Sequence, residues 1–182
     1  MTSTALNSPA TRPLPLDKIL VGLSFALGLA TITGAWGSQL FGGLVPCELC
    51  LEQRMAYYWG LPVIAAILVL WNRLPLTVWY VVMAIAAAIF AWGLYMGAYH
   101  AGVEWGFWPG PTACTGVTGT EMNFEDLGDI NAAPRVVPCD VVQFRFLGIS
   151  FAGYNALVSA AVVALLLIAI WWQWQTRKAK AA

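Results

Sequence analysis

Charged side chains are scarce in this chain of 182 residues, because only 10% are Asp, Glu, Lys or Arg and 60% are hydrophobic. A soluble domain carries about 25% charged residues, so the composition is typical of a membrane protein. The formal net charge of +0 provides no basic surface and argues against a nucleic-acid partner. The sequence also lacks internal repeats and a nucleotide-binding signature.

Charge is absent altogether from four long apolar stretches. About 20 helical residues cross a hydrocarbon core of about 30 Å, and backbone groups in lipid must be satisfied within the helix. We therefore predict one integral-membrane domain over residues 1–182, an all-α bundle of four transmembrane helices that contacts membrane lipid. The predicted spans cover 19–36, 55–71, 76–99 and 151–172, with two long loops at 37–54 and 100–150. No clear A-x-A site follows the first span, so we do not expect it to be a cleaved signal peptide.

The few charges indicate how these spans are oriented. Four spans place both termini and the 72–75 turn on one side, with six basic residues and one acid. The other side carries three basic residues and eight acids. Because cytoplasmic segments carry an excess of Lys and Arg, we predict that both termini are cytoplasmic and that the two long loops face outward.

Cysteine is also missing from the spans. All four cysteines lie in the outward loops: Cys47, Cys50, Cys114 and Cys139. An outward loop is an oxidising setting in which disulfides persist. The first two form a C-x-x-C motif within the stretch VPCELCLEQR, and the other two are separated by 25 positions.

The C-x-x-C motif stands where the second helix is expected to begin, shortly after Pro46. Cys50 would then lie in the first turn, where free backbone N–H groups and the helix dipole favour an anion. Arg54 follows four residues later on the same face. Both effects lower the pKa of a thiol from its usual value near about 8.5. The sequence thus predicts a stabilised Cys50 thiolate, in a redox pair at the membrane interface.

Other interpretations of these residues stay open. The four cysteines could form two static disulfides that staple the loops. They could also bind zinc as four thiolates, although such zinc sites more often consist of two C-x-x-C knuckles. Arg54 could be only an interfacial side chain whose charge reaches water.

His100, the only histidine, lies at the outer end of the third span, on the same side as the C-x-x-C motif. It could donate a proton or a hydrogen bond to a reduced carrier. Glu104 lies four residues later and shares its face if the helix continues. We interpret Glu104 as a solvated interface acid.

Three stretches together resemble one family: PCELCLEQR before the second span, YHAGVEWGFWPGPTAC after the third and CDVVQFRFLG before the fourth. They are similar to disulfide bond formation protein B, the DsbB family, in order along nearly the whole chain. The resemblance implies a quinone-dependent thiol:disulfide oxidoreductase of the bacterial inner membrane, with periplasmic loops. Its partner would be a DsbA-like periplasmic oxidase, and its electron acceptor ubiquinone or menaquinone.

The resemblance also implies a path for the exchange reactions. The partner would attack Cys114 of a Cys114–Cys139 disulfide. The released Cys139 would then attack Cys47 of a Cys47–Cys50 disulfide.

At the quinone, the resemblance implies that Cys50 faces the ring, with Arg54 beside it and His100 as a candidate for shaping the site. No metal is expected. Some members have an apolar residue between the two C-x-x-C cysteines, where this chain has Glu48. A carboxylate there is expected to raise the pKa of a neighbouring thiol.

Two rival interpretations differ in class. Vitamin K epoxide reductase-like proteins also combine a four-helix membrane bundle with two cysteine pairs, but their loop pair precedes the C-x-x-C motif. Here the C-x-x-C motif comes first. The other rival is a structural or transport membrane protein of four spans with disulfide-stapled outer loops, for which no charge within the spans offers support.

Overall fold

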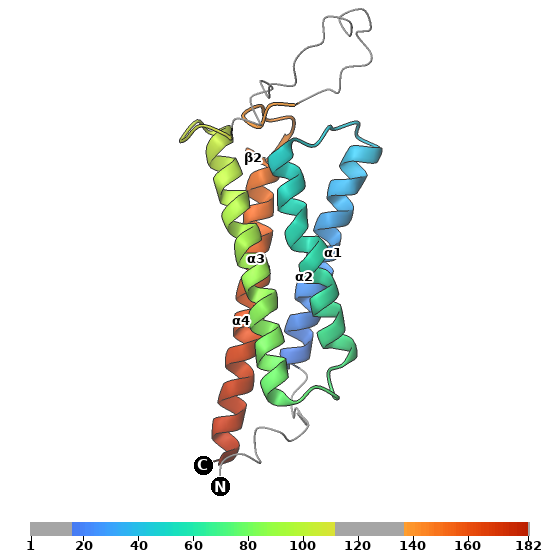
Figure 1. Ribbon diagram of the computed structural model, residues 1–182, viewed down its shortest axis with the longest axis vertical. Helices are drawn as coiled ribbons and strands as arrows, with labels where there is room; N and C mark the ends of the chain where they lie inside the picture. The colour runs from blue at the N-terminus through green and yellow to red at the C-terminus, as the bar shows by residue number, and fades with distance from the viewer. Residues whose placement is uncertain (1–15, 112–136, 182) are drawn as a thin grey trace, which may run out of the picture.

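The computed structural model describes residues 16–111 and 137–181. Its main elements are four helices: α1 (Leu16–Leu40), α2 (Glu48–Val69), α3 (Leu76–Glu104) and α4 (Phe151–Ala181). α1 and α3 each pack against both α2 and α4, which produces the up-and-down bundle of Figure 1. α1 begins and α4 ends at one end of the bundle, and the C-x-x-C motif lies at the other. We call the latter the cysteine end.

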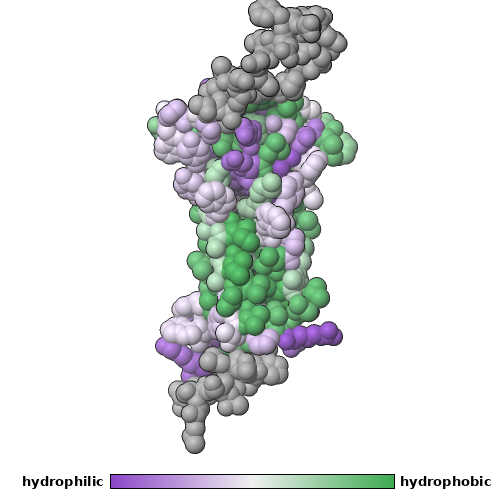
Figure 2. All heavy atoms as spheres, viewed as in Figure 1, coloured by the Kyte–Doolittle hydropathy of each residue, from purple (hydrophilic) through white to green (hydrophobic). Residues whose placement is uncertain are grey.

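Three of the helices, α1, α3 and α4, are long and apolar enough to cross a membrane. α2 is not among them, because its first two turns carry Glu48, Glu52 and Arg54. Figure 2 shows an apolar band around the middle of the bundle and more polar residues towards both ends, the distribution that a bilayer favours. The chain is therefore a multi-pass helical membrane protein, and its fourth span stays a prediction.

The helices are longer than the predicted spans. Part of the predicted loop over 37–54 is helical, because α1 continues to Leu40 and α2 already begins at Glu48. The predicted loop over 100–150 also contains regular structure at both of its ends. α3 continues to Glu104, and an antiparallel hairpin of β1 (Arg145–Phe146) and β2 (Ile149–Ser150) precedes α4. Apolar length limits a membrane span, whereas a helix can continue into polar surroundings wherever its backbone stays hydrogen-bonded.

The bundle core consists of large apolar side chains from all four helices. The fully buried members with the greatest volume are Val21, Ile64, Ile67, Trp79, Met83, Phe90, Val162 and Leu166. Towards the cysteine end the packing changes to a separate cluster made of Cys47, Leu49, Met96, Val103 and Cys139. This second cluster brings the C-x-x-C motif of α2 against α3 and against the segment that carries Cys139.

Candidate functional site

The C-x-x-C motif forms the beginning of α2. Cys47 is the N-cap, and its sulfur accepts a hydrogen bond from the backbone N–H of Cys50 at 3.3 Å. The expectation that the helix starts shortly after Pro46, with Cys50 in its first turn, is confirmed. Both thiols are free, and their sulfurs lie 2.6 Å apart. The pair is thus held at the positive end of the helix dipole.

The two sulfurs face different neighbours. Cys47 is buried in the cluster with Met96, Val103 and Cys139. Cys50 instead lines a cavity on the other side of the motif. One thiol therefore lies next to the second cysteine segment, and the other is open to a cavity ligand.

The two thiols titrate as an unequal pair. Hydrogen bonding to Cys50, followed by burial, raises the pKa of Cys47. The same hydrogen bond, which a Cys47 thiol donates when Cys50 is ionised, lowers the pKa of Cys50. Arg54 also lowers the pKa of Cys50, as predicted, although it is a smaller cause. The predicted stabilised thiolate thus falls on Cys50, mainly because of its neighbour Cys47.

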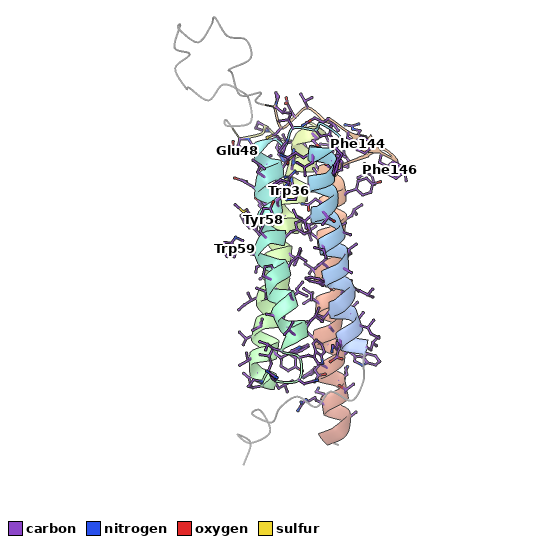
Figure 3. The ribbon with its side chains drawn as sticks, turned by 90° about the vertical axis from the view of Figure 1, so that its right-hand side faces the viewer. Trp36, Glu48, Tyr58, Trp59, Phe144 and Phe146 are labelled. Carbon is purple, nitrogen blue, oxygen red and sulfur yellow. The ribbon has the colours of Figure 1, made fainter. Side chains whose placement is uncertain are left out.

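The expected effect of Glu48 is not found. Glu48 is exposed and points away from the bundle (Figure 3), and it is not among the causes that shift the pKa of either thiol. The carboxylate that raises the pKa of Cys50 is that of Glu104. Sequence adjacency suggested the wrong acid, because successive helical residues point in different directions.

The cavity has a volume of about 450 Å³ and lies between α1, α2, α4 and the segment that contains the β1–β2 hairpin. Its walls are mostly apolar and include Phe144 and Phe146, which Figure 3 shows at the same end of the bundle as Trp36. The polar side chains that line it include Cys50, Gln53, Arg54, Tyr57, Gln143 and Asn155. Apolar walls with a few convergent polar groups are typical of a small-molecule site.

Arg54 is anchored to the last turns of α1. Its Nη1 donates to the side-chain oxygen of Gln39 at 2.8 Å, and its Nη2 reaches the carbonyl of Ala35 at 3.5 Å. The guanidinium lies 5.5 Å from the ring centroid of Trp36, a cation–π distance. The guanidinium of Arg54 is buried. Within the described residues, no carboxylate forms an ion pair with it. Its positive charge is therefore available to an electron-rich group in the cavity.

His100 does not line the cavity. It is buried behind the C-x-x-C motif, with its Nε2 at 3.7 Å from the Cys47 sulfur and 3.2 Å from the backbone carbonyl of Cys139. Its Nδ1 lies 2.6 Å from the side-chain nitrogen of Gln53. His100 therefore contacts the cysteine pair directly, and its neighbour Gln53 lines the cavity.

The interpretation of Glu104 as a solvated acid is wrong. α3 does continue to this residue, but the Glu104 side chain is only 7% exposed and accepts a hydrogen bond from the hydroxyl of Ser150 on β2. One of its oxygens lies 4.0 Å from Nε2 of His100. The hairpin covers this carboxyl group, and nothing in the local sequence announced that contact.

Cys139 is buried and disulfide-bonded. Its partner is neither Cys47 nor Cys50, since both are free, and Cys114 lies outside the described residues. The disulfide of Cys139 does not fit a zinc site of four thiolates.

A metal site made of Cys47, Cys50 and His100 is also a poor fit, although their ligand atoms lie within 4.8 Å of one another. Two thiolates on one tetrahedral zinc, at about 2.3 Å each, lie about 3.8 Å apart. The observed sulfur separation is 2.6 Å. This geometry suits formation of a sulfur–sulfur bond better than shared coordination.

Several polar residues of the site were missed in the sequence. Gln143 clamps the α1–α2 connection, because its amide both accepts from the backbone N–H of Val45 and donates to its carbonyl. Gln53 and Asn155 form part of a buried network beneath the thiols. Polar side chains within membrane helices are a recognisable signal of function, and Asn155, inside the predicted span over 151–172, carries that signal.

A family model described as "Disulfide bond formation protein DsbB" matches residues 17–169. No match was found among curated proteins or among solved structures. The matched region runs from the start of α1 into α4 and includes every site residue described above, which argues against the vitamin K epoxide reductase-like alternative. Members of this family act in disulfide bond formation and lie in the bacterial inner membrane. Since the match covers most of its length, the chain belongs to the DsbB family.

Proposed function

We propose that this protein reoxidises a DsbA-like periplasmic thiol oxidase and passes the two electrons to a membrane quinone. In this proposal the whole chain is one integral-membrane domain with four spans, both termini are cytoplasmic and the cysteine end is periplasmic. A reduced partner dithiol and a quinone enter, and a partner disulfide and a quinol leave. Two electrons and two protons are transferred, so the reaction balances without a further reagent.

The observation that carries the proposal is the cavity beside Cys50. Its volume of about 450 Å³ lies within the range of about 300–1,000 Å³ that is usual for small-molecule sites. Its apolar walls suit a lipid-soluble ring, and Arg54 supplies a cation without a carboxylate partner among the described residues. A bound quinone would supply a two-electron acceptor, held by these walls and by Arg54.

The thiol–disulfide exchange steps take place at Cys47, which lies beside Cys139. The partner thiolate attacks the Cys114 sulfur of a Cys114–Cys139 disulfide, and the bonding pair passes to Cys139. Cys139 then attacks the Cys47 sulfur of the oxidised C-x-x-C pair. The Cys47–Cys50 bond breaks, and the pair passes to Cys50. Burial of Cys47 and Cys139 in one cluster supports this order.

The unequal pKa values assign the two thiols of the C-x-x-C motif different tasks. Cys50 carries the thiolate, because the pKa of Cys50 is lowered by the Cys47 hydrogen bond. A low pKa makes a thiol a good leaving group, which favours release of Cys50 into the cavity. When the second partner thiol displaces Cys114, the freed Cys114 thiolate attacks Cys139 and the bonding pair passes to Cys47. Cys47 is then protonated until quinone takes up two electrons and the disulfide of the motif forms again.

The experiment is a quinone-reduction assay with the full chain in detergent. Reduced DsbA-like oxidase and a quinone are added, and the loss of quinone absorbance is followed. Wild type is expected to consume quinone, whereas Cys50→Ser and Cys114→Ser are expected to lose essentially all turnover. Glu52→Gln, a change at an exposed position beside the motif, serves as the control with wild-type rates. Normal turnover by Cys50→Ser would refute the assigned role of Cys50.

Arg54→Met tests the cation separately. Removing a charge-assisted hydrogen bond costs about 1.5–3 kcal/mol, so the KM for quinone is expected to rise by roughly tenfold or more. The rate of reduction of the C-x-x-C disulfide by a saturating small dithiol, measured without quinone, is expected to change much less, because Arg54 is only a minor cause of the lowered pKa of Cys50. An unchanged KM for quinone would leave Arg54 with a purely structural role at the end of α1.

A further inference from the structure

A line of buried polar side chains runs beneath the two thiols. Nε2 of His100 lies 3.2 Å from the carbonyl of Cys139, and Nδ1 of His100 lies 2.6 Å from Nε2 of Gln53. Oε1 of Gln53 accepts from Nδ2 of Asn155 at 2.7 Å. Asn155 in turn accepts from the hydroxyl of Tyr57 at 2.6 Å. All four side chains are less than 9% exposed, so each hydrogen bond matters.

The direction of this line is fixed at both of its ends. Nδ2 of Asn155 also points at the carbonyl of Gly93, at 3.5 Å, and a carbonyl can only accept. Nδ2 must therefore be the donor to Gln53, which leaves the amide N–H of Gln53 facing Nδ1 of His100. An amide nitrogen does not accept, so Nδ1 carries the lone pair.

The other end of the line requires the same tautomer. A neutral imidazole with a bare Nδ1 carries its proton on Nε2. Three acceptors surround that nitrogen: the Cys139 carbonyl at 3.2 Å, the Cys47 sulfur at 3.7 Å and a Glu104 oxygen at 4.0 Å. A proton on Nδ1 would instead meet the amide N–H of Gln53.

We propose that Gln53 and Asn155 are positioning residues that hold His100 as its Nε2–H tautomer, with that N–H directed at Cys139 and Cys47. The imidazole then acts as a hydrogen-bond donor that keeps the Cys139 segment beside the C-x-x-C motif. It keeps its proton while the Cys139–Cys47 bond forms and the pair passes to Cys50. The kinetic consequence rests on the proposed function, whereas the tautomer does not.

The sole histidine makes the tautomer directly measurable. The full chain, carrying an affinity tag without histidine, is labelled with ring-¹⁵N histidine in detergent, and its two ring-nitrogen signals belong to His100 alone. We expect a protonated Nε2 and a bare Nδ1 at neutral pH. A proton on Nδ1 in the wild-type spectrum would overturn the proposal, whatever the variants do.

Gln53→Glu tests the donor, because an ionised carboxylate can only accept. We expect Nδ1 to gain a proton in this variant, recorded up to about pH 9 so that the new carboxyl group is ionised. Gln175→Glu repeats the substitution at an exposed position near the far end of α4 and is expected to leave both signals unchanged. A bare Nδ1 in Gln53→Glu at this pH would contradict the role of Gln53.

Asn155→Leu tests the step that does not touch the ring. It frees the Gln53 amide to rotate, so we expect the Nδ1 signal to shift and broaden as its hydrogen bond is lost. Ser159→Ala, one turn later in α4, loses a side-chain oxygen that lies 3.4 Å from the Tyr57 hydroxyl and is expected to keep the wild-type spectrum. An unchanged spectrum in folded Asn155→Leu would remove Asn155 from the proposal.

The kinetic readout separates this inference from the proposed function. In Asn155→Leu we expect reduction of the C-x-x-C disulfide by the partner oxidase to slow by about three- to tenfold, the effect of one lost hydrogen bond. Gln175→Glu, at an exposed position near the far end of α4, is the control and should be reduced by the partner oxidase at the wild-type rate. Absence of quinone reduction with the predicted tautomer would refute only the proposed function. Wild-type exchange in a variant with a disturbed spectrum would refute the positioning role.

Discussion

At the scale of single residues, the site depends on one asymmetric hydrogen bond. Cys47 donates to Cys50, and this contact alone is the largest cause that lowers the pKa of Cys50 and raises that of Cys47. The charge of Arg54 and the opposing charge of Glu104 are smaller causes. The sequence correctly predicted that the pKa of Cys50 is lowered. It attributed the lowered pKa to the helix dipole and Arg54, whereas the largest cause is the hydrogen bond to Cys47.

Cys47→Ala removes that donor. Since the hydrogen bond lowers the pKa of Cys50, its loss is expected to raise the pKa, so that less Cys50 is thiolate at neutral pH. The pH profile of alkylation at Cys50, located by mass spectrometry, should move to higher pH. Cys47→Ser keeps a hydroxyl donor and should move it less. A profile that stays in place or moves to lower pH in Cys47→Ala would contradict the assignment.

At the scale of secondary-structure elements, α3 and α4 approach each other closely near the site. A Cβ atom added at Gly97 would lie 2.8 Å from the backbone nitrogen of Ala156 and 3.0 Å from Nδ2 of Asn155. Backbone atoms cannot give way as a flexible side chain can, so the two helices must separate to accept any larger residue. Only glycine allows this contact, which also holds Asn155 in its network.

Gly97→Ala is therefore expected to destabilise the bundle by about 1–3 kcal/mol, the usual cost of overpacking. Gly22→Ala is the matched control, because an added Cβ at Gly22 meets nothing within 4 Å. That change should be neutral or stabilising by up to about 1 kcal/mol, since alanine favours a helix. Thermal unfolding in detergent measures both. A Gly97→Ala protein as stable as Gly22→Ala would contradict the close packing.

The sequence predicted the elements better than their contacts. Long apolar runs located all four helices, because hydrophobic length is a local property of the chain. The extension of α3 to Glu104 and the β1–β2 hairpin were missed, as was the bond between Glu104 and Ser150. The bond between Glu104 and Ser150 joins residues 46 positions apart, and no periodicity records such a contact. The contact between Gln53 and Asn155 is equally non-local, because these residues are 102 positions apart.

At the scale of the whole molecule, the packing of the bundle supports the prediction that α2 crosses the membrane. The composition of α2 alone is marginal for a membrane span. α2 packs between α1 and α3, which are both apolar enough to span. Its 22 residues extend about 33 Å at 1.5 Å per residue, enough for a hydrocarbon core of about 30 Å. A bilayer that surrounds α1, α3 and α4 therefore encloses most of α2. The charged start of α2, Glu48 to Arg54, lies at the cysteine end. α1 ends and α3 reaches Glu104 at the same end of the bundle.

Asn72→Cys tests this arrangement in the turn between α2 and α3. The variant is made in a background in which the four native cysteines are serine, and intact cells and inverted membrane vesicles are treated with a membrane-impermeant maleimide. If all four helices span with both termini cytoplasmic, position 72 is labelled in inverted vesicles and protected in cells. A cysteine at Glu48, which is exposed at the cysteine end, provides the opposite control and should be labelled in cells. Labelling of position 72 from the outside would mean that α2 does not cross, or that the basic residues Arg73 and Arg177 do not mark the cytoplasmic side.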